Sequence, residues 1–403
     1  MRRLTLLLLA LVASFASSQS VQLAGHAAAT FGVAVGGTLP VAAAEVALTL
    51  SGEVGSGFFP DASYSASIVA GYDAASGRST LELDEARVTA YLGEFELSAG
   101  KLRRAWGSTD GVNPVDVLNP HDMSFPPEQG KVAVPMLHGV YYADGVSIEL
   151  ALLPVFVPST LPGPAWRPTF SPDLPQGVTV VRVLPAEERR PAAELNNVQF
   201  GVRASMQLSR FDVSATYFRG FRSEPTMSAR LEPAGAPGQM LLQPILSYDR
   251  VNVLGLDFSG VIGDVVLRGE AAYTIADTPG DAAATGSDSL QAVLGGEYLI
   301  PGGPRTVLQA IYDYSAPTQV SDSSSSLKFM TALLYEPTNR TQVEVGWVQS
   351  LDGSGLFKPS LTYSFADGVR GEAVGYVFYG GAGTEFGDFR ENSQLRLSLV
   401  YDF

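Results

Sequence analysis

Apolar and polar residues alternate along most of the chain, most clearly in its last nine residues. Leu395, Leu397, Leu399, Tyr401 and Phe403 occupy every second position there. Successive side chains of a β-strand point to opposite faces, so this pattern predicts a strand with one apolar and one polar face. A strand of about 9–11 residues with this alternation is long enough to cross a membrane. An amphipathic strand of a soluble sandwich is the alternative.

Similar segments repeat from Gln19 onward, separated by turn-rich breaks and with almost no helical periodicity. We count eighteen candidate strands, with sixteen as the alternative count. The clearer ones lie near residues 81–92, 94–106, 145–155, 197–208, 210–219, 251–262, 264–276, 289–300, 305–315, 326–336, 341–350, 357–366, 369–379 and 393–403, and the weaker ones near 27–36, 41–52, 62–73 and 136–143.

The breaks between these segments alternate in length. Short turns such as Gly93-Glu94 and Gly263-Asp264 alternate with longer segments, which are 107–135, 157–196, 223–250, 277–288, 316–325 and 380–392. Short periplasmic turns and long external loops are typical of outer-membrane barrels, and a soluble sandwich has no reason to sort its loops in this way. The pattern therefore predicts one all-β domain over 19–403, a transmembrane antiparallel β-barrel. The break at 52–61 is an exception, because it is long on the side that should be short.

Charged residues within the strands fall on the face opposite to the apolar one. A basic side chain on the lipid face near the midplane costs about 2–4 kcal/mol, so these residues are expected to face the lumen. The pore-lining candidates are Glu85, Arg87, Lys101, Arg104, Glu149, Arg203, Arg268, Glu270, Glu297, Lys328, Glu344 and Arg396.

The first eighteen residues have the pattern of a secretory signal. Arg2 and Arg3 precede the apolar run 4–12, and Ala16 and Ser18 offer a cleavage site. The apolar run is too short for a transmembrane helix, and the chain contains no cysteine for a lipid anchor or a disulfide. The export signal and the strands together predict the outer membrane of a diderm bacterium as the location.

Removal of the signal would leave 24 basic and 41 acidic residues, a net charge of −17 with neutral histidines. This balance makes nucleic acid an improbable partner. If the pore is open, it also favours cations, because rings of acidic side chains attract them. The basic residues Lys101, Arg103 and Arg104 oppose that preference unless lumen carboxylates such as Glu85 or Glu96 pair with them.

One stretch is rich in spaced motifs. It reads Gly100-Lys101, Trp106-Gly107 and Asp110-Gly111, and then Asp116-Val117-Leu118-Asn119-Pro120 followed by Asp122. Here the chain resembles a domain-of-unknown-function family of bacterial outer-membrane barrels, which is porin-like and loosely related to alginate-export barrels. That family has arginine and glutamine where this chain has Lys101 and Leu102. The resemblance implies the fold and the location, and it implies no solute. The terminal Phe403 also resembles the signal that the barrel-assembly machinery reads, which implies that machinery and outer-membrane lipid as partners.

The same stretch predicts local order in the loop 107–135. Asn-Pro pairs and Asp side chains are turn and helix-capping signals, so we expect a short helix, with Asp110, Asp116, Asn119 and Asp122 ordering the loop. The loop is either architecture at the barrel mouth or an inward-folded constriction. The Pro-rich loop 157–196, with Trp166 and Phe170, predicts a semi-rigid cap over the mouth or a lid that contacts a ligand.

Enzymatic signals are poor. The chain has three histidines, His26, His121 and His138, and no cysteine, which argues against thiol catalysis and most multi-histidine metal sites. His121-Asp122 lies inside the turn motif and is expected to cap a helix rather than act as a protease pair. We therefore predict a porin-like channel or uptake barrel for small solutes, filtered by the loops 107–135 and 157–196, with no cofactor or metal. A plugged structural or adhesive barrel and a route for a hydrophobic compound are the alternatives.

Overall fold

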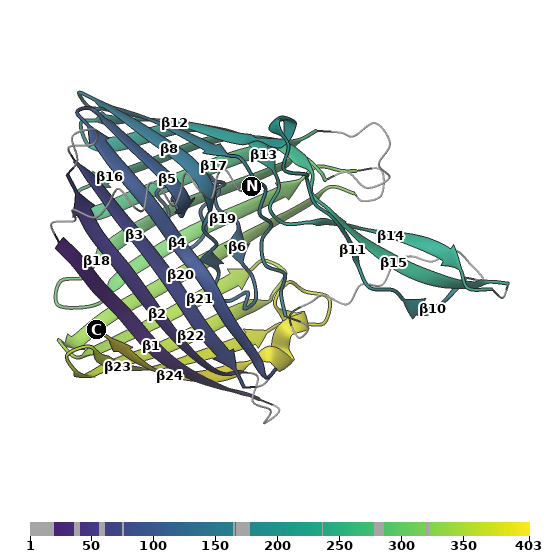
Figure 1. Cartoon of the computed structure of the whole chain (residues 1–403). Helices are drawn as coiled ribbons and strands as arrows, with labels where there is room; N and C mark the ends of the chain where they lie inside the picture. Colours follow the sequence, from purple (N-terminus) through teal and green to yellow (C-terminus); the bar gives the residue numbers. More distant parts are fainter. Residues whose placement is uncertain are drawn as a thin grey trace.

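The computed structural model describes residues 20–35, 41–55, 61–74, 76–163, 166, 178–235, 237–277, 286–318 and 322–403. The predicted signal 1–18 lies outside these residues. Eighteen strands form one antiparallel sheet, as the alternation predicts (Figure 1). They are β1 Ser20–Ala34, β2 Val41–Val54, β3 Ala62–Asp73, β4 Arg78–Leu92, β5 Phe95–Leu102, β8 Val134–Ala143, β9 Val146–Leu153, β12 Gln199–Leu208, β13 Phe211–Phe221, β16 Arg250–Ile262, β17 Val265–Ala276, β18 Ser289–Leu299, β19 Arg305–Ser315, β20 Ser324–Thr338, β21 Thr341–Ser350, β22 Gly355–Ala366, β23 Val369–Tyr379 and β24 Gln394–Asp402.

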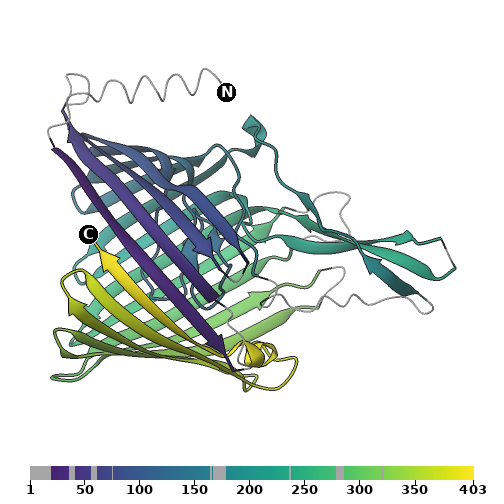
Figure 2. The ribbon, with the colours of Figure 1, turned by 60° about the horizontal axis from the view of Figure 1, so that its bottom comes forward.

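The sheet closes on itself where its first and last strands pair. β1 and β24 run antiparallel side by side from His26 opposite Asp402 to Ala34 opposite Gln394 (Figure 2). Closure gives each barrel strand a paired neighbour on both sides, although residues 78–85 of β4 pair with β3 alone because β5 is shorter. The predicted count of eighteen strands is confirmed. β1 begins at Ser20, seven residues before the segment that its weak alternation indicates.

Connections of two residues gather at one end of the barrel, which we call the turn end. They are 93–94, 144–145, 209–210, 263–264, 339–340 and 367–368. Several of these turns need a residue with positive φ, such as Gly263 at 62° and Ser209 at 50°. The long connections lie at the opposite end, the loop end. The predicted sorting by length is not complete, because 74–77 and 351–354 are short connections at the loop end. Residues 56–60 of the break at 52–61 lie outside the described part of the chain.

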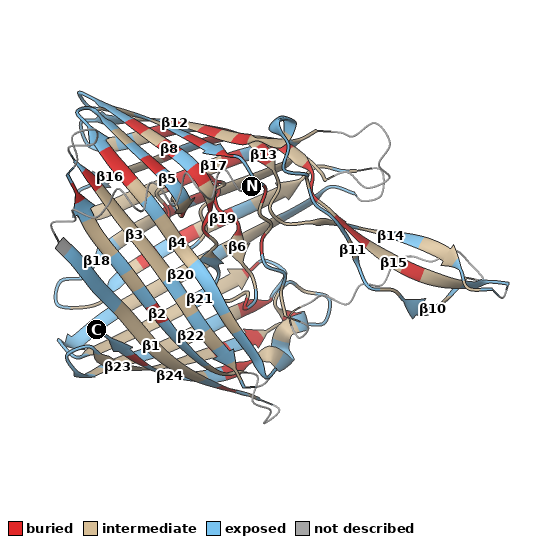
Figure 3. Cartoon of the chain, in the orientation of Figure 1, coloured by how far each residue is buried: buried red, intermediate tan, exposed pale blue. Residues whose placement is uncertain are grey.

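Exposed positions recur along the barrel strands (Figure 3), and many of those on the outer face carry apolar side chains. Leu254, Leu256, Leu294 and Leu308 are among the exposed residues of its middle band. Exposed aromatic residues flank this band. Tyr91, Phe95, Tyr141, Tyr298, Tyr335, Tyr363, Phe365, Tyr401 and Phe403 lie toward the turn end, and Tyr72, Tyr273, Tyr312, Trp347 and Phe357 toward the loop end. Two aromatic girdles around an apolar band are typical of a barrel embedded in a bilayer.

The loops predicted at 157–196 and 223–250 contain strands that the sequence analysis missed. β10 Thr179–Val183, β11 Glu187–Arg189, β14 Thr226–Pro233 and β15 Gln239–Ser247 form a separate four-stranded sheet. This sheet projects away from the barrel at the loop end, so it does not cap the mouth as expected (Figure 1). Both described ends of the loop 157–196 do contact the barrel or its interior. Val157 packs on the buried cluster around Trp106, Arg250 of β16 donates to Asn197, and the Trp166 ring lies 5.2 Å from that of Phe125 and 5.6 Å from that of Phe378. Phe170 lies outside the described residues.

Helix is scarce in the described part of the chain. It consists of two short 3-10 turns, η2 Leu195–Asn197 and η3 Gly387–Asn392. No helix among the described residues is long and apolar enough to cross a membrane.

Candidate solute pore

Residues 103–133, which we call the inward segment, leave β5 at the loop end and fold into the lumen before the chain re-enters the wall at β8. Trp106, Val115 and Leu118 of this segment are at most 2% exposed. They pack on apolar side chains that the wall turns inward, which include Met136, Leu153, Phe218, Val251 and Val253. The structure thus places the segment inside the barrel rather than at its mouth. The expected short helix is absent. The segment instead contains two very short strands, β6 His121–Asp122 and β7 Gly130–Lys131, which pair with each other.

Two glycines let the segment approach the wall closely. A Cβ atom on Gly201 would lie 2.6 Å from the Trp106 ring, and one on Gly255 would lie 2.7 Å from Val115. Any larger side chain at these positions would push the segment away from the wall. The two glycines are therefore part of the surface that receives the segment.

Asn119 and Asp116 fold the segment back on its own start. The amide oxygen of Asn119 accepts the backbone N–H of Arg104 at 2.7 Å, and its amide nitrogen donates to the carbonyls of Leu102 and Val132 at 2.9 Å each. Asp116 accepts the backbone N–H of Trp106 at 3.3 Å and forms an ion pair with Lys131. Burial raises the pKa of the Asp116 carboxyl, although Lys131 and the Trp106 N–H oppose this shift.

Glu270 of β17 anchors the middle of the segment. Its carboxylate accepts the backbone N–H and the hydroxyl of Thr109 at 2.6 and 2.8 Å, together with the backbone N–H groups of Ser108 and Val115. Arg268 lies two residues before Glu270 on the same face of β17. It pairs with Asp110 of the segment at 2.9 Å and with Glu297 at 2.7 Å. Charge-assisted hydrogen bonds are about twice as strong as neutral ones, so β17 holds this part of the segment firmly.

The end of the segment reaches the far wall. The guanidinium of Arg396 on β24 lies 3.2 Å from the centroid of the Phe125 ring, and the Phe125 ring packs edge-on against Tyr376 of β23. Glu128 accepts the Tyr376 hydroxyl and lies 3.5 Å from Lys358 of β22. The inward segment therefore crosses the lumen from β5 to β22–β24.

One side of the lumen is dry. His138 and the indole N–H of Trp106 both contact a carboxylate oxygen of Glu149 at 3.1 Å. Beside them Arg203 donates to Asp257 at 2.9 Å. The side chains of His138, Asp257 and Arg203 are 2%, 4% and 10% exposed. Water is thus largely excluded along β8, β9, β12 and β16, which we call the dry side.

The opposite side of the lumen is wet. His26 and Glu45 share the inward parity of Ser398 and form a pair at 3.4 Å, and their side chains are 41% and 50% exposed. Arg87 on β4 is 44% exposed, and Arg370 and Glu372 on β23 are also well exposed. The neighbouring inward positions on β1–β3 carry small side chains, which are Ala28, Thr30, Thr49, Ser51, Ser65 and Ser67. We call this region, β1–β4 with β23 and β24, the wet side.

The remaining pore-lining candidates are placed as follows. Glu85 lies within 3.8 Å of Arg87 and Arg103. Arg104 pairs with Glu96 at 3.3 Å and donates to Ser98. Lys328 pairs with Asp313 at 3.1 Å and with Glu385 at 2.8 Å. Glu344 lies opposite Ser360 on the inward face. Asp122, a loop-ordering candidate, accepts the N–H of Ser124 at 3.0 Å and orders a turn rather than a helix.

Lys101 differs from the prediction. It lies opposite Ala86 and Pro135 and shares the parity of the exposed Phe95 and Leu97, so it belongs to the outer face at the loop end. Its ammonium donates to the carbonyl of Leu83 at 2.5 Å. The strand ends at Leu102, which is why the outward position so close to the rim tolerates a charge.

Asp84 is a lumen residue that the alternation does not identify. A β-bulge in β4, opposite Ser67 and Ile68, shifts the alternation by one residue. Asp84 therefore joins Glu85 on the inward side and forms a bidentate pair with Arg103. The consecutive acids Asp84 and Glu85 are the one sequence signal of this bulge.

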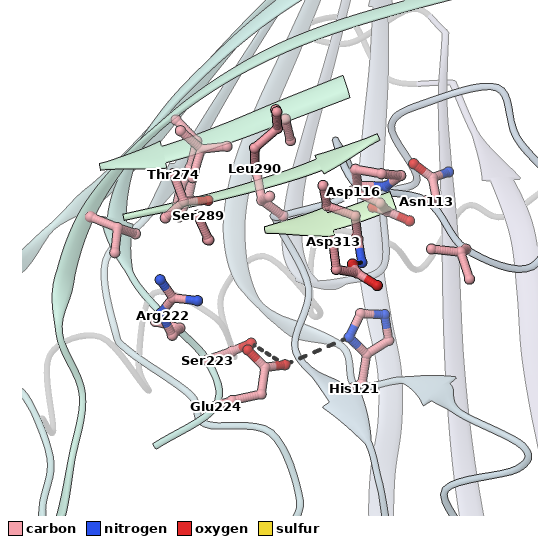
Figure 4. Close-up of a pocket in the computed structure, with 18 of the residues that line it drawn as sticks. Asn113, Asp116, His121, Arg222, Ser223, Glu224, Thr274, Ser289, Leu290 and Asp313 are labelled. Atoms are coloured by element: carbon pink, nitrogen blue, oxygen red, sulfur yellow. Dashed lines mark hydrogen bonds and ion pairs between the residues drawn. The ribbon is translucent and has the colours of Figure 1, made fainter. Parts of the chain in front are cut away.

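A cavity of about 670 Å³ opens between the inward segment and the wall formed by β13 and β16–β19 (Figure 4). Asn113, Asp116 and His121 line it from the segment, and Arg222, Ser223 and Glu224 line it from the chain that follows β13. Glu224 accepts hydrogen bonds from Ser159 and Ser223 and lies 4.0 Å from His121. No group of three or more His, Cys, Asp or Glu side chains within the described ranges is arranged to hold a metal.

No protein-family model and no curated protein matches the chain. Solved structures do match it. The chain is similar to OccAB4 of Acinetobacter baumannii, with a TM-score of 0.57 at 10% identity over 96% of this chain and 99% of that one. It is also similar to OccK11 (OpdR) of Pseudomonas aeruginosa, with a TM-score of 0.55 at 11% identity over 95% and 96% of the two chains. OmpT, an outer membrane protein of Vibrio cholerae, matches with a TM-score of 0.51 at 9% identity over 95% and 99%. These likenesses show that the fold is that of an outer-membrane β-barrel.

Proposed function

We propose that the protein is a porin-like channel for small solutes in the outer membrane of a diderm bacterium. The observation that carries the proposal is the unequal exposure of lumen charges. The Glu45 side chain on the wet side is 50% exposed, whereas the Asp257 side chain on the dry side is 4% exposed. The inward segment excludes solvent along the dry side and touches the far wall through Phe125 and Glu128, and the route for solutes runs through the solvated part of the lumen beside β1–β4.

The inward segment acts as a fixed filter in this proposal. It is held by hydrogen bonds at both ends and by a buried hydrogen bond in the middle, which leave it little freedom to leave the lumen. Selectivity then depends on the side chains between the segment and the wet side. The projecting sheet plays no part in the filter, because it extends away from the mouth (Figure 1).

The plugged structural barrel remains the second candidate function. It is favoured by the contacts of Phe125 and Glu128 with the far wall, which extend the segment across the whole lumen. Planar bilayers separate the two functions. The purified protein in symmetrical potassium chloride should insert with discrete, reproducible current steps. A heat-modifiable, fully folded protein that gives no steps would reject the channel and support the plugged barrel.

A further inference from the structure

The barrel wall is lower on one side than elsewhere. β5 and β9 have 8 residues each and β8 pairs with both of them, whereas β4, the other neighbour of β5, has 15 residues (Figure 1). A strand needs about 9–11 residues to cross a bilayer. β5 and β9 are therefore too short to span the membrane, and we call β5, β8 and β9 the low wall.

The aromatic girdles show at which height the low wall ends. A strand tilted by about 45° rises about 2.4 Å per residue. On β4, Tyr91 of the turn-end girdle is twelve residues from Ser79, which lies opposite Tyr72 of the loop-end girdle. That separation gives about 28 Å, close to the usual apolar band of about 25 Å. On β5, Lys101 is only six residues from Phe95 of the turn-end girdle, or about 14 Å above it. β5 therefore ends little more than halfway across the band.

Above the end of β5, one edge of β4 is unpaired. Residues 78–85 pair with β3 alone. The carbonyl of Leu83 faces the free edge, because it accepts a hydrogen bond from the ammonium of Lys101 at 2.5 Å. Successive residues of a strand alternate in direction, so the backbone groups of Leu81 face the same edge. Backbone groups without partners cost several kcal/mol each in hydrocarbon, so this edge needs polar surroundings.

Lys101 has the same need. It lies on the outer face of the low wall, and its ammonium has no carboxylate at ion-pairing distance within the described part of the chain. The neighbouring acids Asp84 and Glu85 pair with Arg103 instead. A lysine on the lipid face near the midplane costs about 2–4 kcal/mol. An uncompensated cation and an unpaired strand edge thus meet at one level of the outer face.

A bilayer adapts to a short wall by thinning beside it, and flanking lysines extend toward the head groups. We propose that the leaflet at the loop end thins beside the low wall and that Lys101 binds the phosphate of an anionic lipid there. The head group and its water hydrate the free edge of β4, and the acyl chains lie along the exposed Leu97 and Leu137. This lipid site goes beyond the channel function and does not depend on whether the pore is open.

Nitroxide labels test the thinning. Ala99 on β5 and Leu294 on β18 are exposed outer-face residues, and each lies four residues from an aromatic residue of the turn-end girdle, Phe95 and Tyr298. β18 has 11 residues, enough to cross the bilayer. In liposomes, a water-soluble nickel complex should collide with the label in Ala99→Cys several times more often than with the label in Leu294→Cys. Equal collision rates at the two sites would overturn the thinning.

Brominated lipids test the anion site. A bimane label in Ala99→Cys should be quenched more strongly by brominated phosphatidylglycerol than by brominated phosphatidylcholine, with a preference of about fivefold for a single lysine near the surface. Adding Lys101→Met should abolish the preference, and adding Lys101→Arg should keep it. The label in Leu294→Cys, the matched control, should show none.

Heat-modifiable gel migration checks that each variant is folded. Equal quenching by the two lipids at residue 99 with Lys101 in place, or an unchanged preference after Lys101→Met, would overturn the lipid site. Neither result would bear on the proposed channel, whose test is the current in planar bilayers.

Discussion

At the scale of single residues, buried charge is concentrated where the inward segment meets itself and the wall. The Asp116 side chain is only 5% exposed, and Lys131 is its partner. Glu270 makes the corresponding contact with the backbone of residues 108–115. Removing one partner of such a pair leaves an uncompensated buried charge, and this usually costs about 3–5 kcal/mol.

Lys131→Met should therefore loosen the inward segment without unfolding the barrel. Hydrogen exchange at residues 106–118 should show a local opening free energy that is lower by about 3 kcal/mol. The double variant Asp116→Asn, Lys131→Met removes both charges and should recover most of the protection. Equal exchange in the parent and in Lys131→Met would show that the pair does not hold the segment.

The same variant should respond to acid. The pKa of Asp116 is raised above its ordinary value of 3.8 by burial, so the folded segment favours the protonated acid. That stabilisation is complete below the ordinary value and is lost as the pH rises through the higher folded pKa. Protection in Lys131→Met should accordingly increase as the pH falls, whereas the double variant should show no such recovery.

At the scale of elements, the alternation of apolar and polar residues predicts the strands of the barrel wall. It does not predict the segment that fills part of the lumen. The strands of residues 395–403 and 197–208 were predictable because lipid on one side and a polar lumen on the other impose period two. The burial of Phe218, Val251 and Val253 on the inward face could not be predicted. These strands have apolar side chains on both faces, and the sequence does not show which face another segment covers. The bulge at Asp84 shifts the alternation by one residue. No local sequence pattern predicts that two distant loops pair to form the four-stranded sheet of β10, β11, β14 and β15.

The Asn and Asp residues of the motifs in the loop 107–135 order its backbone, but not in the way that the sequence predicts. Asn119 and Asp116 do satisfy backbone groups, but these belong to Leu102, Arg104, Trp106 and Val132 rather than to a helix start. The residue types were recognisable from the sequence, whereas their partners depend on how the chain folds back. The family resemblance of this motif stays a prediction.

Gly201→Val tests the fit between the inward segment and the wall. The added side chain meets the Trp106 ring, so it should displace the segment, lower the thermal midpoint of unfolding and raise the single-channel conductance. Gly346→Val is the control, because the nearest atom to a Cβ there lies 3.6 Å away on the inward face of β21. If both valines have the same effect, the segment does not depend on close contact with β12.

At the scale of the whole molecule, the acidic balance acts through the few charges that solvent reaches. Glu149, Glu270 and Glu297 were expected to favour cations, but they are engaged by His138, by the inward segment and by Arg268. The exposed lumen acids include instead Glu45, Glu372 and Asp402, and basic residues such as Arg87 and Arg370 lie near them. The net charge of the chain therefore overstates the field in the open part of the lumen.

A weak cation preference follows. In a potassium chloride gradient the reversal potential should have the sign of a cation-selective pore and a small size. Glu45→Gln should move it toward zero, whereas Glu297→Gln, on the side filled by the segment, should not. An anion-selective reversal potential in the parent would contradict this distribution of charge.

The central claim is that the solute route follows the wet side and avoids the dry side. The chain contains no cysteine, so single cysteines at Glu45 and at Ser214, which is buried beside Arg203, can be compared on an unmodified background. A negatively charged methanethiosulfonate reagent should reduce the single-channel current stepwise in Glu45→Cys and leave Ser214→Cys unchanged. Stepwise reduction in Ser214→Cys together with an unaffected Glu45→Cys would place the route on the opposite side of the inward segment and contradict the account.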